Sequence, residues 1–237
     1  MRKKKVGAIA IKSFALLVVL STAYLVTANH AIAQDAKTTY PSMAPIEQYL
    51  MDRTAEIALA RSAAPESISG DAEVLVLGRH GFETAVQGKN GFVCIVERSW
   101  TSAADADFWN PKVRTPICYN AAAAHSLLPR NIKRTDLILA GRTQAQVDEA
   151  IVAAVAKKEL PAMEPGAMCY MMSKQGYGGD SVKHWPSHLM FFYSQIAPAT
   201  WGAGLPGSPI LAMSDDHEHL TMFAIGVQRW SDGTEAR

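Results

Sequence analysis

Side chains that can bind metals or move protons gather in the second half of the chain. His184 and His188 lie in the segment KHWPSH, and His217 and His219 lie in DDHEH. Residues two apart on a strand point to the same side, so His217 and His219 could bind one ion together with His188 on a neighbouring strand. These four imidazoles predict a site for a divalent transition metal. The alternative is that they are ordinary surface or turn histidines.

A second candidate for chemistry is the motif of Arg79, His80 and Gly81, which ends an apolar run in the segment VLVLGRHGFETA. This segment resembles the phosphate pocket of the histidine phosphatase superfamily. The resemblance implies that His80 accepts the phosphoryl group and that Arg79 neutralises its oxygens. It also implies a second histidine and a second arginine, for which Arg130 is a loose match. The alternative interpretation of RHG is a turn between two strands.

The chain contains three cysteines, Cys94, Cys118 and Cys169. An oxidising compartment permits one disulfide and one leftover thiol. Cys94 lies in a predicted strand and Cys118 just before a helical stretch, so a bridge between them is the simplest prediction, with buried free thiols as the alternative. Cys169 then fills the core among methionines, since a nucleophilic role would need a nearby base that lowers its pKa.

The segment from Leu160 to Tyr193 contains five of the ten methionines, Cys169, two of the histidines and the glycine-rich sequence GYGGDS. Loops and aromatic side chains of this kind line pockets for small molecules. The same residue types also fill ordinary cores. We therefore expect a small-molecule ligand at residues 164–193, in a site that this segment shares with DDHEH or with the RHG turn and does not form alone.

The first 33 residues have the pattern of an export signal. Basic residues at positions 2–5 precede an uncharged apolar run over residues 14–28, and Ala31 and Ala33 stand just before Gln34. The pattern predicts a signal peptide over residues 1–33 with cleavage after Ala33, and hence a periplasmic or secreted protein. The membrane is then a partner only through this segment before cleavage. An uncleaved anchor is the alternative, although a spanning helix needs about 20 apolar residues.

The net charge and the length of the chain argue against a nucleic-acid-binding protein and for a single domain. Cleavage would remove five basic residues and no acidic ones, which changes the formal net charge from +1 to −4. The densest basic group left, Arg130, Lys133 and Arg134, is more typical of a solvated helix face than of a phosphate-binding surface, which argues against nucleic acid as a partner. We predict a flexible linker over residues 34–44 and a single domain over residues 45–237.

Hydrophobic spacing predicts an α+β fold for this domain. One amphipathic helix is expected from Pro45 to Arg61, and a capping box of Thr143 and Gln146 predicts the start of another in a helical block over residues 101–158. Strands are predicted in the segments EVLVLG, FETAVQ, FVCIVERSW, HLMFFYS, SPILAMS and LTMFAIGVQRW. The sequence GKNG predicts a hairpin between the second and third of these. This order of elements is typical of a mainly antiparallel sheet, here of about five to six strands, with packed helices.

Together these patterns favour an exported protein of the cell envelope that binds a small ligand or a metal ion. One alternative is a phosphomonoesterase-like hydrolase that uses Arg79, His80 and Gly81. A second alternative is a structural envelope protein without a ligand.

Overall fold

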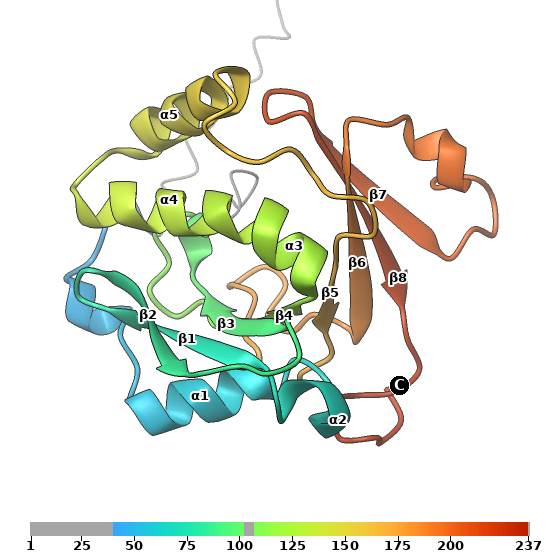
Figure 1. Ribbon diagram of the computed structural model, residues 1–237, viewed down its shortest axis with the longest axis horizontal. Coiled ribbons are helices and arrows are strands. Elements are labelled where there is room, and N and C mark those ends of the chain that lie inside the picture. The colour runs from blue at the N-terminus through green and yellow to red at the C-terminus, as the bar shows by residue number, and fades with distance from the viewer. Residues whose placement is uncertain (1–39, 102–106, 237) are drawn as a thin grey trace, which may run out of the picture. The chain divides into compact units, whose positions relative to one another are not determined.

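The computed structural model describes residues 40–101 and 107–236. The predicted signal peptide over residues 1–33 lies outside this range. The described residues form eight strands in one sheet and five α-helices (Figure 1). The mixed α and β composition and the mainly antiparallel sheet are confirmed, but the prediction of five to six strands was too low. In the described ranges, no helix has the length and apolar character needed to cross a membrane.

The strands are β1 (Glu73–Gly78), β2 (Gly81–Val86), β3 (Val93–Glu97), β4 (Thr115–Tyr119), β5 (Met168–Met171), β6 (His188–Ser194), β7 (Ile210–Asp215) and β8 (Leu220–Gly226). The helices are α1 (Arg53–Arg61), α2 (Glu66–Ser69), α3 (Ala121–Ser126), α4 (Leu128–Leu139) and α5 (Gln144–Ala156). Short 3-10 helices are η1 (Ile46–Gln48), η2 (Ser99–Thr101) and η3 (Pro198–Trp201). All six predicted strands are present, and β4 and β5 are the two that the sequence patterns missed.

The sheet has the order β2-β1-β3-β4-β5-β6-β8-β7. Only β1 and β3 pair in parallel, and the other neighbouring pairs are antiparallel. Cys94 of β3 stands directly opposite Cys118 of β4, and the two form a disulfide. The predicted bridge is therefore confirmed, and Cys169 is a buried free thiol.

The prediction of a hairpin at GKNG is wrong. β2 pairs with β1 through the two-residue turn of Arg79 and His80, so β2 is an edge strand and does not touch β3. Gly81 closes this turn with a φ of 129°, a conformation that residues with a Cβ atom rarely adopt. Asn90 instead secures the crossing to β3, because its Nδ2 donates to the carbonyl of Ile68 at 2.7 Å and its Oδ1 accepts from the amide of Phe92 at 3.0 Å.

Two helical layers cover the first half of the sheet (Figure 1). On the side of α1, Leu59 packs with Val74, Val76 and the disulfide. On the side of α3 and α4, Ile95 and Ile117 pack against Leu128 together with Cys169. The free thiol and the disulfide thus lie in different core clusters on opposite faces of the sheet, because neighbouring positions on a strand face opposite sides.

The helix expected from Pro45 to Arg61 consists of two pieces. η1 is a single short turn, and α1 begins only after Asp52, whose carboxylate accepts a hydrogen bond from the amide of Ala55 at 2.9 Å. Met43 and Ala44, which we assigned to the linker, pack against the cluster of Tyr49 with α4 and α5. The packed domain therefore begins before Pro45.

The helix α5 confirms the predicted capping box. The hydroxyl of Thr143 accepts from the amide of Gln146 at 3.4 Å, and the side chain of Gln146 accepts from the amide of Thr143 at 3.1 Å. Val147 and Ile151 of α5 are fully buried against Ile138 of α4. This contact fixes the turn between the two helices.

Candidate functional site

The RHG motif lies at the exposed tip of the β1–β2 hairpin. The guanidinium of Arg79 forms an ion pair with Glu47 at 2.5 Å, and both side chains are more than half exposed. His80 is also exposed. The charge of Arg79 is therefore matched by a carboxylate and does not face a phosphate pocket.

The other groups that a phosphatase site would need lie elsewhere. Arg130 is buried on α4, where its Nη1 donates to the carbonyl of Glu218 at 2.9 Å. His188 lies on β6, four strands away from β1, which corresponds to about 19 Å. The described residues thus do not bring these groups together around His80, and the motif acts as the turn that the alternative interpretation proposed.

The four candidate metal ligands fall into two separate groups. His188 pairs with Gly226 at one end of the β6–β8 ladder, whereas His217 and His219 lie in the turn beyond its other end. The ladder between these ends spans about 20 Å. Among the described residues, no group of three or more His, Cys, Asp or Glu side chains is placed to hold a metal ion.

Three of these histidines have local partners. The Nδ1 of His184 lies 2.7 Å from the carbonyl of Gly176, and its ring packs on Trp230 at 5.5 Å. The Nδ1 of His188 lies 2.6 Å from the carbonyl of Pro186, and burial lowers the pKa of this imidazole. His219 has a positive φ of 51° and contacts Gln195 at 2.9 Å. These contacts fix loops and strand ends.

The glycine-rich loop is tightly packed. A Cβ atom at Gly178 would collide with the indole of Trp185, and one at Gly176 would lie 2.9 Å from Pro116. The carboxylate of Asp180 accepts hydrogen bonds from the hydroxyls of Tyr177 and, at 2.6 Å, Tyr40. Close packing therefore explains these glycines.

Cys169 lies beside a polar cluster on the face of the sheet that α3 and α4 cover. The hydroxyl of Tyr119 donates to Glu97, and Asn131 donates to Glu97 at 2.9 Å and to Tyr119 at 2.7 Å. Burial raises the pKa of Glu97 to about 7 and holds the pKa of the Cys169 thiol well above its usual range. A protonated, fully buried thiol is a poor nucleophile, which supports the core-filling interpretation.

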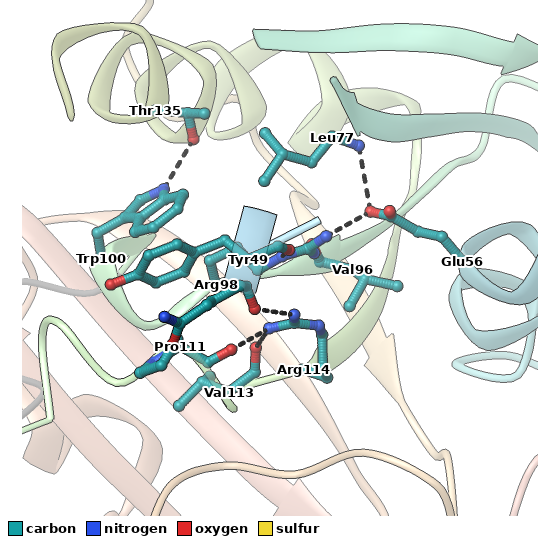
Figure 2. A network of polar contacts seen from close by, with 11 residues as sticks. Tyr49, Glu56, Leu77, Val96, Arg98, Trp100, Pro111, Val113, Arg114 and Thr135 are labelled. Carbon is teal, nitrogen blue, oxygen red and sulfur yellow. Dashed lines mark hydrogen bonds and ion pairs between the residues drawn. The ribbon is translucent and has the colours of Figure 1, made fainter. Parts of the chain in front are cut away.

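A buried polar network joins η1, α1 and the end of β3 (Figure 2). The guanidinium of Arg98 donates to Glu56 at 2.9 Å and to the carbonyl of Tyr49 at 2.8 Å, while the amide of Leu77 donates to the same Glu56 oxygen at 3.1 Å. Neither side chain of the ion pair is more than 1% exposed. Such a pair holds its elements in one arrangement, because separating the charges would leave one of them buried alone.

The network extends towards the surface through Arg114. Its guanidinium donates to the carbonyls of Pro111 at 2.8 Å and Val113 at 2.7 Å (Figure 2). It also donates to the carbonyl of Gln48 at 3.0 Å. The hydroxyl of Tyr49 then donates to the carbonyl of Trp109 at 2.8 Å. Trp109 is therefore held in place from the buried side.

Trp109 forms one wall of a surface cavity of ≈ 600 Å³, which we call the α4–α5 cavity. The other walls come from residues 41–43, Ile138, residues 141–143 of the α4–α5 turn, and Gln144, Ala145 and Asp148 of α5. Apolar side chains and the start of a helix thus face the same space. The sequence analysis missed this cavity, because its walls come from three separated parts of the chain.

The charged residues of the cavity have different surroundings. Asp148 accepts from Arg134 at 2.9 Å, and Arg134 also pairs with Glu218, which lies 3.6 Å from Arg130. Arg130 and Arg134 are buried, so their assignment to a solvated helix face was wrong. Arg142 is exposed and forms no ion pair with any other described residue.

Comparison with known proteins finds no matching family model, no matching curated protein and no matching solved structure.

Proposed function

We propose that this domain binds a small ligand in the α4–α5 cavity, as part of an exported protein of the cell envelope. The observation that carries the proposal is the cavity itself. Its volume of ≈ 600 Å³ lies in the range of about 300–1,000 Å³ that is typical of small-molecule sites. This location differs from residues 164–193, where the sequence led us to expect the ligand.

The composition of the walls supports the proposal. Met43 and Trp109 are partly exposed and offer an apolar surface with the buried Ile138 beside them, and Arg142 and Asp148 add charged groups to the lining. Apolar walls with a few polar groups are the usual arrangement of a ligand pocket. Trp109 and the α4–α5 turn are also fixed by buried contacts, which lowers the entropy cost of binding.

A fragment screen followed by NMR tests the proposal. Ring-sized fragments are added to ¹⁵N-labelled protein, and the backbone amides of residues 141–145 and the indole N–H of Trp109 are followed. We expect a subset of fragments to shift these signals together. A screen in which fragments shift only signals elsewhere in the protein would exclude the α4–α5 cavity as the site.

A matched pair of variants tests whether the NMR shifts arise from binding in the α4–α5 cavity. Ala145 lines the cavity and Ala156 lies at the far end of α5, and both are exposed helical alanines. Ala145→Phe should fill part of the space and weaken fragment binding, whereas Ala156→Phe should leave it unchanged. Equal effects of the two substitutions would contradict the proposal.

A further inference from the structure

We propose that the α4–α5 cavity selects ligands that carry an anionic group, a carboxylate or a phosphate, on an apolar body. This inference rests on the proposed function and adds the chemical class of the ligand. It follows from the charges around the cavity and from its apolar wall.

The acidic side chain in the wall is already neutralised. Asp148 pairs with Arg134 at 2.9 Å, and the side chain of Arg134 is only 3% exposed. Arg134 and Arg130 together face Asp148 and Glu218, so two guanidinium groups meet two carboxylates. The two arginines and two carboxylates together have no formal net charge. Both arginines are buried in these ion pairs and are not available to bind a ligand.

Among the described residues that line the cavity, Arg142 is then the charged one without an ion pair. Its backbone is fixed, because its amide donates to the carbonyl of Leu137 at 3.1 Å and it lies between Gly141 and the N-cap residue Thr143. A guanidinium presents a planar set of donors that matches a carboxylate or a phosphate with two parallel hydrogen bonds. The positive charge of Arg142 in the lining therefore favours an anion over a neutral or cationic group of the same size.

The body of the ligand is set by the apolar part of the lining. Trp109 is partly exposed and Ile138 is buried beneath the turn, and both contribute to the lining. Because this wall and Arg142 line the same cavity, one ligand can pack an aromatic or aliphatic body on the wall and present an attached anionic group to Arg142. The side chain of Met43 adds further apolar surface.

Three probes of similar size test the charge preference. Benzoate and benzamide share a ring and a planar substituent but differ in charge, and phenyl phosphate carries the other anion. Each is titrated into the purified ¹⁵N-labelled protein, and dissociation constants are read from the amides of residues 141–145. We expect benzoate or phenyl phosphate to bind about 10-fold more tightly than benzamide, as one charge-assisted hydrogen-bond pair supports.

Arg142→Gln should remove this preference and leave the affinity for benzamide unchanged. Arg53→Gln is the matched control, since Arg53 is an exposed arginine that pairs with Glu83 away from the cavity. It should keep the preference. Tighter binding of benzoate identifies a carboxylate ligand, and tighter binding of phenyl phosphate identifies a phosphate ligand.

Two results would overturn the inference and are distinguishable. If benzamide shifts the amides of residues 141–145 with the same affinity as the anions, the charge preference fails while the ligand cavity stands. If none of the probes shifts these amides, the proposed function fails at this cavity and the preference fails with it.

Discussion

Individual charged side chains in this domain join distant parts of the chain. Arg130 and Arg134 look like solvent-facing residues of an amphipathic helix when α4 is considered alone. Their partner, Glu218, lies in the turn before β8 and is 84 residues from Arg134. In the DDHEH segment, the residue with buried contacts is therefore the carboxylate of Glu218. The histidines of this segment had led us to predict a metal site. Spacing along one helix cannot reveal a partner at that separation.

Removing the charge of Glu218 should destabilise the domain. Glu218→Gln would leave Arg130 without its carboxylate and Arg134 with only Asp148, and both guanidinium groups are buried. We expect the free energy of unfolding to fall by about 3 kcal/mol, because a buried charge then lacks its partner. Urea denaturation measures this change.

The control for that experiment is the exposed pair of Arg53 and Glu83, whose side chains are 50% and 61% exposed. Glu83→Gln should cost at most about 1 kcal/mol. A similar small loss for Glu218→Gln would show that the buried ion pairs contribute little.

Glu97 should make the stability depend on pH. Burial raises its pKa from 4.5 to about 7, so the folded protein holds this proton more tightly than the unfolded chain. The resulting stabilisation is complete below about pH 4.5 and is lost as the pH rises through about 7. Glu97→Gln cannot ionise, and the wild type should therefore lose stability relative to this variant between about pH 5 and about pH 8.

Urea midpoints of both proteins at several pH values measure this difference. Glu83→Gln is again the control, because it makes the same change from a carboxylate to an amide at an exposed position. Parallel profiles for wild type and Glu97→Gln would contradict the prediction.

At the scale of single elements, local sequence patterns predicted where strands occur better than they predicted which strands pair with each other. The apolar run of β1 and the capping box of α5 were recognised from neighbouring residues alone. The GKNG hairpin failed because Asn90 and Gly91 permit a tight turn without requiring one, and the Arg79–His80 turn competes for the same β2 strand. β4 and β5 were missed because each is short and stands beside helical or methionine-rich sequence.

The disulfide between β3 and β4 should contribute measurably to stability. Replacing Cys94 and Cys118 together by alanine should lower the free energy of unfolding by about 2–4 kcal/mol. A reducing agent should likewise shift the urea midpoint of the wild type but leave the double variant unaffected. Cys169→Ala is the control that removes a buried thiol without removing a bond, and it should keep the response to the reducing agent.

At the scale of the whole domain, the two edges of the sheet differ. β2 at one edge is covered in part by α4, whereas β7 at the other edge exposes 70% of Leu211 and 48% of Met213. The sequence predicted β7 as a strand but could not show that it lies at an edge. The candidate cavity was also beyond prediction, since its walls meet only after α4, α5 and the residues before η1 have packed.

An exposed apolar edge strand favours pairing between molecules. Leu211→Lys should raise the protein concentration at which aggregation begins on warming, because a charge at the edge opposes strand addition. Leu205→Lys is a matched control, since Leu205 is 58% exposed but lies in a loop. Light scattering during heating measures both variants, and equal protection by the two substitutions would contradict a role for the edge.

The sheet also constrains the order in which the domain can be assembled. β7 precedes β8 in the chain, yet it reaches the sheet only through β8, which lies between β6 and β7. During synthesis, β7 has no strand to pair with until residues 220–226 have emerged. During that interval β7 and its exposed apolar side chains have no neighbouring strand. In a chain cut before Leu220, β7 would never gain one.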